Sequence, residues 1–308
     1  MNIERPKDED QLGLTSLFNV IWKGKILILL FTFVFLASAA AISLLLPNKY
    51  TSSSLLMLVD NEEENSIASS FGALGGIASM AGVDVGAGKV EKVDELLARL
   101  NSRDFLEHLL TFEMVKENLT AANDYDSINK KTLFNKKIYD DSSGKWIGKS
   151  NKFKQAIPST LESQKYFNNH VSITFNKLNS LIEISVEHYS PDFSYNFLNL
   201  IINEANNISK EIDVSHYEKS IAYLEELLSV TSNQDLRSSI NQLMFSEIRK
   251  LMLANIDDFY LLKPIDKAFK PERRSSPKRT QFSIIGGLLG MMLSIFILLL
   301  RFFIRNRY

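Results

Sequence analysis

Two long apolar runs dominate the hydropathy pattern of this chain. They cover residues 26–46 and 280–300, and neither contains Asp, Glu, Lys or Arg. A helix rises about 1.5 Å per residue, so about 20 such residues cross the roughly 30 Å hydrocarbon core of a bilayer. The pattern predicts a transmembrane helix near each terminus. It leaves short polar tails at 1–25 and 301–308 and a large polar domain at 47–279.

Alternation of apolar and polar residues predicts strands in this polar domain. Val, Ile and Phe alternate with polar residues over 171–175 and again over 182–186, with a turn signal at 178–180 between them. This is typical of a β-hairpin with one buried face. Residues 50–60 and 259–265 are expected to form two further strands.

Helical periodicity covers most of the remaining polar domain. Residues 90–119 carry a helical apolar stripe, with Ser102 as a candidate N-cap inside it. Ser190, Pro191 and Asp192 form a helix start, because they supply a capping hydroxyl, a proline at the first helical position and an acid in the first turn.

The helix that starts there is unusually long. Neither Pro nor Gly occurs in residues 192–230, and about 40 helical residues extend roughly 60 Å. A polar break at 231–233 precedes a second amphipathic helix at 235–255. We therefore expect an α+β fold: two transmembrane helices flanking a mixed α/β base, with a long extended helical arm at about 190–255.

Composition and motifs exclude several functions. The net charge is −1, without the clustered basic face of a nucleic-acid-binding protein. The absence of cysteine does not locate the domain in any compartment. The four histidines show no metal-ligand spacing, so we predict no catalytic, cofactor-binding or metal-binding residues and no enzymatic activity.

Two glycine-containing segments need separate interpretations. Residues 144–150 resemble a phosphate-binding loop, but they place three residues between the glycines where that loop needs four, and no apolar strand precedes them. Nucleotide binding is therefore not expected. Residues 71–88 are rich in Gly and Ala and are expected to form a close-packed loop or a broken helix.

Charge around the first apolar run favours an N-terminus inside the cell. Lys23 and Lys25 precede this run and only Lys49 closely follows it. Six basic residues before the second run oppose this orientation, but large domains translocate largely regardless of charge. We therefore expect both termini to be cytoplasmic. A signal-peptidase site at 37–39 is the alternative, but the apolar run continues past it to Leu46.

Small residues recur every four positions in the second apolar run, at Gly286, Gly290 and Ser294. They form one stripe of a helix, where small side chains allow two membrane helices to approach closely. The alternative is that glycine is simply common in membrane helices. Before this run, Pro271 and Pro277 favour an extended backbone.

The segment at 271–279 is the strongest resemblance to a known family. Ser276, Pro277, Lys278 and Arg279, which run into the spaced glycines, match the proline-rich juxtamembrane motif of the chain-length determinant proteins, or Wzz-type polysaccharide co-polymerases. The arrangement of the two apolar runs and the polar domain resembles this family over the whole chain. Ser294 differs, because a further glycine is expected there.

The resemblance implies a function and partners. Members form homo-oligomeric rings or bells in the bacterial inner membrane, with the large domain in the periplasm. They set the length of polysaccharide, such as O-antigen, that a Wzy-type polymerase makes on undecaprenyl-linked chains, so the expected partners include membrane lipids and lipid-linked polysaccharide. Larger relatives carry a cytoplasmic kinase, for which residues 301–308 leave no room. A scaffold subunit of a polysaccharide export assembly and a two-span periplasmic sensor are the alternatives.

Overall fold

A computed structural model describes residues 22–59, 87–147, 157–256 and 259–306. The chain divides into two compact units. One contains Met1–Asn48 together with Arg274–Tyr308, and the other contains Lys49–Arg273. We call the first the membrane unit and the second the central unit, and describe each by itself.

A four-stranded antiparallel sheet in the order β6-β7-β1-β8 forms the base of the central unit. It comprises β1 (Tyr50–Leu58), β6 (Val171–Asn176), β7 (Leu181–His188) and β8 (Leu262–Asp266). Strands β6 and β7 form the predicted hairpin. The buried face alternates along β7 at Ile182, Ile184 and Val186, which are fully buried. Strand β8 is at the edge of the sheet and pairs only with β1. Pro264, which has no backbone N–H, is tolerated there because no second strand needs that donor.

Helices pack on this sheet and enclose one hydrophobic core. The six helices described in the central unit are α5 (Ala87–Leu100), α6 (Arg103–Leu109), α7 (Val115–Ala121), α8 (Thr160–His170), α9 (Pro191–Val230) and α10 (Gln234–Ile256). The core joins apolar side chains of α5 to α9 with those of β1, β6, β7 and β8. Two small hairpins lie between α7 and α8: β2 (Ala122–Asp126) with β3 (Lys131–Phe134), and β4 (Tyr139–Asp140) with β5 (Lys145–Trp146).

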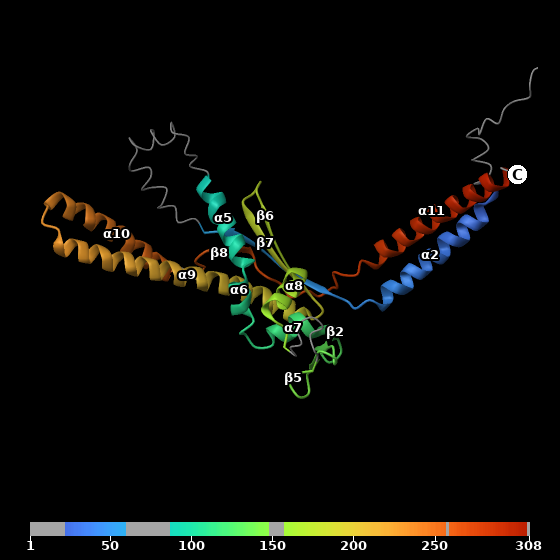
Figure 1. Cartoon of the computed structure of the whole chain (residues 1–308), viewed down its shortest axis with the longest axis horizontal. Helices are drawn as coiled ribbons and strands as arrows, with labels where there is room; N and C mark the ends of the chain where they lie inside the picture. Colours follow the sequence, from blue (N-terminus) through green and yellow to red (C-terminus); the bar gives the residue numbers. More distant parts are fainter. Residues whose placement is uncertain (1–21, 60–86, 148–156, 257–258, 307–308) are drawn as a thin grey trace, which may run out of the picture. The chain divides into compact units, whose positions relative to one another are not determined.

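Helices α9 and α10 form the long helical arm. Ser190 caps α9 by accepting a hydrogen bond from the Phe193 amide, and α9 then runs for 40 residues. Figure 1 shows α10 folding back beside the distal part of α9. Arg237 stabilises the turn between them, because its guanidinium donates to the carbonyl oxygens of Leu228 (2.7 Å) and Thr231 (3.0 Å).

The membrane unit is an antiparallel helical hairpin. Its helices are α2 (Lys25–Leu45) and α11 (Arg279–Asn306), which lie side by side (Figure 1). Both are long and apolar enough to cross a membrane. Helix α11 continues beyond the predicted end at Leu300, because apolar Phe302, Phe303 and Ile304 follow Arg301 and prolong the helical pattern.

Two expectations for the central unit need correction, and one helix had no counterpart among them. The predicted helix at 90–119 is three helices, and Met114 with φ +60° starts the third of them. Helix α8 was not predicted. The last strand starts at Leu262 instead of residue 259. Residues 71–86 and 148–150 lie outside the described residues, and Gly144 is a turn residue with φ +64° in the β4–β5 hairpin.

Candidate membrane-anchoring site

The small-residue stripe of α11 lies against α2. A Cβ added at Gly290 would lie 2.7 Å from Cβ of Phe35 and 2.8 Å from the carbonyl oxygen of Phe31. A Cβ at Gly286 would lie 3.1 Å from the carbonyl oxygen of Phe35 and would overlap the Ala39 methyl group. These distances are below ordinary van der Waals contact, so the two backbones approach closely only because both residues are glycine.

Ser294 extends this close packing by one helical turn. Its side chain is fully buried, and its hydroxyl donates to the Met291 carbonyl oxygen at 2.7 Å. The bond satisfies the hydroxyl within its own helix, which matters in an apolar environment where an unpaired polar group costs free energy.

Helix α2 supplies a matching stripe that sequence reasoning missed. Phe35, Ala39 and Ser43 also recur every four residues, and Ser43 is the one fully buried residue of α2. The signal was present as the spacing of Ala39 and Ser43, but several other small residues in the same run obscured it.

The juxtamembrane residues approach α11 without forming a helix. Pro271 and Pro277 are buried, Ser276 is half-buried and Lys278 is exposed. Arg279 is the first residue of α11, and its guanidinium donates from Nη2 to Oδ1 of Asn48 at 3.1 Å. Because Asn48 follows α2, this bond ties together the two chain segments at one end of the membrane hairpin.

The basic residues before α11 differ in their surroundings. Lys270 forms an ion pair with Asp192 at the start of α9, and the hydrogen bond to this carboxylate raises the pKa of Lys270. Lys267, Arg273, Arg274 and Lys278 have exposed side chains. Local neutralisation therefore accounts for Lys270, whereas Lys278 remains accessible to a partner.

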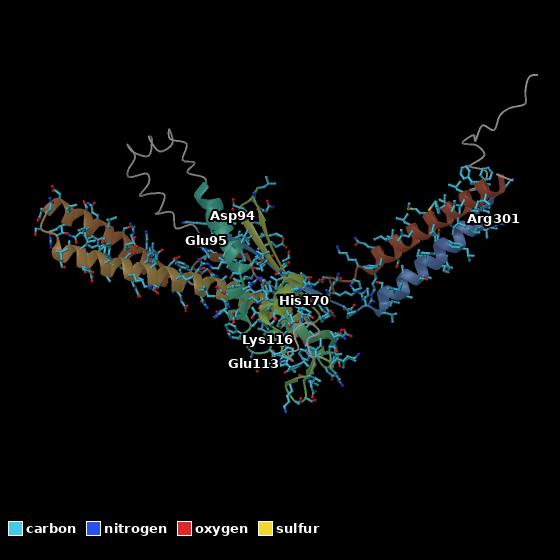
Figure 2. All side chains as sticks on the ribbon, in the orientation of Figure 1. Asp94, Glu95, Glu113, Lys116, His170 and Arg301 are labelled. Atoms are coloured by element: carbon cyan, nitrogen blue, oxygen red, sulfur yellow. The ribbon has the colours of Figure 1, made fainter. Side chains whose placement is uncertain are left out.

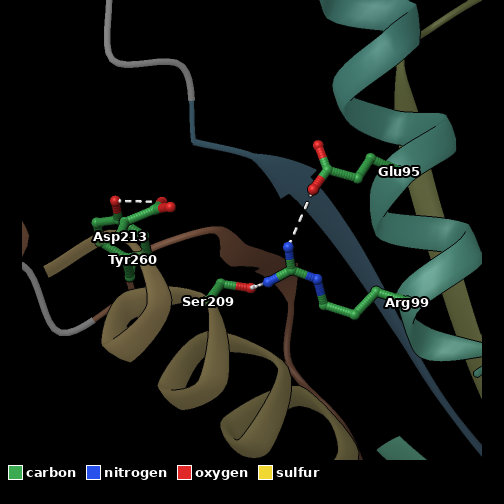
Figure 3. A network of polar contacts seen from close by, with 5 residues as sticks. All are labelled: Glu95, Arg99, Ser209, Asp213 and Tyr260. Atoms are coloured by element: carbon green, nitrogen blue, oxygen red, sulfur yellow. Dashed lines mark hydrogen bonds and ion pairs between the residues drawn. The ribbon is translucent and has the colours of Figure 1, made fainter. Parts of the chain in front are cut away.

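A polar network fixes the place where the arm leaves the base (Figure 3). Arg99 of α5 donates to Glu95 (3.0 Å) and to Ser209 of α9 (3.4 Å). The Tyr260 hydroxyl donates to Asp213 of α9 at 2.7 Å. Burial, with the bonds to Tyr217 and Asp213, raises the pKa of Tyr260, so its hydroxyl stays protonated and continues to donate.

Asn206 adds a second attachment between α9 and β8. Its Oδ1 accepts hydrogen bonds from the amides of Leu261 and Leu262, both at 2.8 Å. Its Nδ2 donates to the carbonyl oxygens of Leu262 (3.1 Å) and Ile202 (3.0 Å). One buried amide side chain thus satisfies two backbone groups of Leu262 in the strand, one of Leu261 just before it, and one of its own helix.

The four histidines have structural surroundings. His188 is fully buried; its Nδ1 accepts from the Ser190 amide and its Nε2 contacts the Asn118 carbonyl oxygen, both at 3.0 Å. Burial, with nearby His170, lowers the pKa of His188 to about 3, so the ring is neutral. His170 (labelled in Figure 2) contacts the Glu187 carbonyl oxygen, and His108 contacts Glu204. His216 lies on α9. The described ranges contain no group of three side chains placed to hold a metal ion.

These features define a class of protein: a membrane hairpin joined to an α+β domain with a long helical arm. Residues 10–141 match the family model described as Wzz: Chain length determinant protein. Over these residues, which are less than half of the chain, it is similar to the Wzz chain length determinant domain, and the resemblance seen in the sequence is confirmed. The match does not extend to the juxtamembrane motif or α11.

A solved structure is similar over almost the full length of both chains. It is described as a full-length bacterial polysaccharide co-polymerase, with 15% sequence identity, 96% of this chain and 99% of that chain covered, and a TM-score of 0.38. A comparison with curated proteins found no significant match.

Proposed function

We propose that this protein regulates the chain length of a bacterial surface polysaccharide, O-antigen or a related polymer, without being an enzyme. The observation that carries the proposal is the match of residues 10–141 to the Wzz model. The two candidate membrane helices support it, because they would hold the protein in the same membrane as a membrane polymerase. The protein acts with a Wzy-type polymerase on undecaprenyl-linked chains.

The proposal includes a topology and an assembly. Both termini are cytoplasmic, residues 26–46 and 280–300 span the inner membrane, and residues 47–279 are periplasmic. Several copies form a ring or bell. Exposed apolar side chains on α10 support self-association: Leu243, Phe245 and Met252 expose 59%, 68% and 59% of their surface.

Lys278 and Arg279 are the proposed contacts to phosphate groups or to the polymerase. Arg279 is held in place by Asn48, whereas the Lys278 side chain is exposed. The guanidinium group binds phosphate as a planar fork and the ammonium group as a point charge, so the two residues together suit a lipid-linked pyrophosphate.

Polysaccharide profiling in a deletion strain tests the function. We expect loss of a preferred chain length, with short and random lengths in its place, and recovery when the intact gene is returned. An export scaffold would instead lower the amount of polysaccharide at the surface without changing its length distribution. A sensor would change gene expression before it changed the polymer.

Two paired variants test the juxtamembrane role in the same strain. We expect Lys278→Ala with Arg279→Ala to shorten or randomise chain length while the protein stays in the membrane. Arg273→Ala with Arg274→Ala is the matched control, because it removes the same charge from exposed side chains of the same juxtamembrane segment but leaves Ser276, Pro277, Lys278 and Arg279 unchanged. An equal effect of both pairs would show that positive charge in general, and not a specific contact of Lys278 and Arg279, affects chain length.

Reporter fusions test the topology. An alkaline phosphatase fused at residue 150 should be active and one fused at residue 308 should be inactive. The opposite result would place the central unit in the cytoplasm and contradict the proposed contact with periplasmic chains.

A further inference from the structure

An apolar groove of about 410 Å³ runs along the membrane hairpin at the end where α2 begins. Leu29, Phe33 and Leu36 of α2 and Met291 of α11 line it, and Trp22 and Lys25 lie at its end. Leu29 and Phe33 expose 70% and 66% of their surface, so the neighbouring helix does not cover the groove.

The end of the groove is positively charged. The Lys25 ammonium group lies 5.3 Å from the centre of the Trp22 ring. The sequence has no Asp or Glu in residues 22–48 or 274–306, so no carboxylate of these segments neutralises Lys25. Trp and Lys side chains concentrate at the membrane–water interface. The end of the groove therefore lies at headgroup level and its apolar wall lies in the hydrocarbon region.

We propose that this groove binds one anionic phospholipid. An acyl chain lies along Leu29, Phe33 and Leu36, and the headgroup phosphate pairs with Lys25. Basic pockets beside transmembrane helices attract anionic headgroups by the same electrostatics. A lipid without net charge fills the groove equally well but gains less from the Lys25 ammonium group.

A second copy of the hairpin fits this groove less well. A copy inserted in the same orientation brings its own Lys23, Lys25 and Arg301 to the same membrane level, and like charges placed together are unfavourable. Arg301, near the C-terminal end of α11, is labelled in Figure 2. The glycines that permit close helix contact already face α2, whereas the groove is lined by large side chains.

Quenching of Trp22 fluorescence by brominated lipids tests the site. The chain has two tryptophans, so Trp146→Phe leaves Trp22 as the only reporter. The full-length variant is placed in phosphatidylcholine vesicles with a small, equal fraction of brominated phosphatidylglycerol or brominated phosphatidylcholine. We expect brominated phosphatidylglycerol to be enriched at Trp22 about fivefold, the ratio that corresponds to about 1 kcal/mol per basic residue at a membrane surface.

Charge variants distinguish a lipid-binding site at Lys25 from general attraction of anionic lipids to the basic residues of this segment. Lys25→Gln should abolish the preference, and Lys25→Arg should keep it. Lys23→Gln is the matched control, since it removes the same charge from the same end but its side chain does not line the groove. Equal quenching by both lipids in the starting protein, or equal losses in the Lys23 and Lys25 variants, would overturn the proposal.

The competing occupant is tested by cross-linking. Leu29→Cys should give no disulfide-linked dimer in these vesicles. Efficient cross-linking, with Trp22 shielded from both brominated lipids, would assign the groove to a second copy and overturn the lipid site. The assay contains no polysaccharide, so its outcome is independent of the proposed function.

Discussion

Replacing Asn206 by Ala removes a buried side chain that links the arm to the edge of the sheet. Asn206 exposes 5% of its surface and makes four hydrogen bonds, three of them to the backbone of Leu261 and Leu262. Leu262 is fully buried, so water cannot easily replace the lost acceptor at its amide. The variant therefore leaves the buried Leu262 N–H without a partner and removes the partner of the partly buried Leu261 N–H.

The magnitude follows from these lost bonds. The buried Leu262 donor left unsatisfied costs about 1–3 kcal/mol, and the two other lost bonds to Leu261 and Leu262 cost about 0.5–1.5 kcal/mol each, so together they cost about 2–6 kcal/mol. We expect a destabilisation of about 3–5 kcal/mol, a large share of the roughly 5–15 kcal/mol that stabilises a folded domain. For a domain of this size, that lowers the melting temperature by about 10–15 °C.

The assay is thermal unfolding of the full-length protein in detergent, followed by circular dichroism at helical wavelengths. Asn207→Ala is the matched control, because Asn207 is the next residue, is exposed, and bonds only to Glu204 of its own helix. We expect that control to change the melting temperature by about 1 °C or less, as surface substitutions usually do. If both variants melt together, Asn206 does not hold β8 as described.

Two further predictions concern packing in the membrane unit and the acid stability of the central unit. Gly290→Ala should loosen the packing of α11 against α2, which would be measured as faster proteolysis and lower yield in detergent. Gly287→Ala is the control and should have no such effect, because a Cβ there lies at an ordinary 3.5 Å from Leu36. Equal behaviour of the two variants would contradict the close approach at Gly290. The pKa of His188 is about 3 in the folded state and about 6.5 in the unfolded state. Because the unfolded state binds the proton first as pH falls, the contribution of His188 to the free energy of unfolding is complete above pH 6.5 and is lost as pH falls toward 3. In denaturant titrations, the free energy of unfolding should be about 2 kcal/mol lower at pH 5 because of His188. His188→Gln should make the free energy of unfolding depend less on pH, and an unchanged pH dependence in this variant would contradict the role of His188.

Local sequence signals predicted the elements that depend on neighbouring residues. The hairpin β6–β7 follows from strict alternation, and the start of α9 follows from Ser190 and Pro191, whose chemistry acts within one turn. Helix α8 was missed although Ser159 and Glu162 form a capping box, because only Ser163 and Phe167 of this helix are buried and its apolar stripe is too narrow to recognise.

Contacts between distant residues could not be predicted in the same way. The turn at Met114 requires a left-handed conformation that the sequence does not mark with glycine. Asn206 gives no sign in the sequence that it binds a strand more than fifty residues later. In the candidate site, the spacing of Gly286 and Gly290 predicted a packing face, but the choice of Phe35 and Ala39 as the surface against it appears only in the structure.

The pairing of β1 with β8 has a mechanical consequence for the central unit. Ser54 and Ser52 donate hydrogen bonds to the carbonyl oxygens of Asp266 (2.6 Å) and Phe269 (2.7 Å), so the chain leaving β8 runs back along the start of β1. Both connections to the rest of the protein therefore leave the unit side by side. A force that pulls both connections in the same direction does not separate β1 from the segment after β8. A force that pulls them apart breaks the hydrogen bonds between these segments one at a time, and the Ser52 bond breaks first. We therefore expect the unit to stay folded when its two connections move together and to lose the pairing of β1 with the segment after β8 when they are pulled apart.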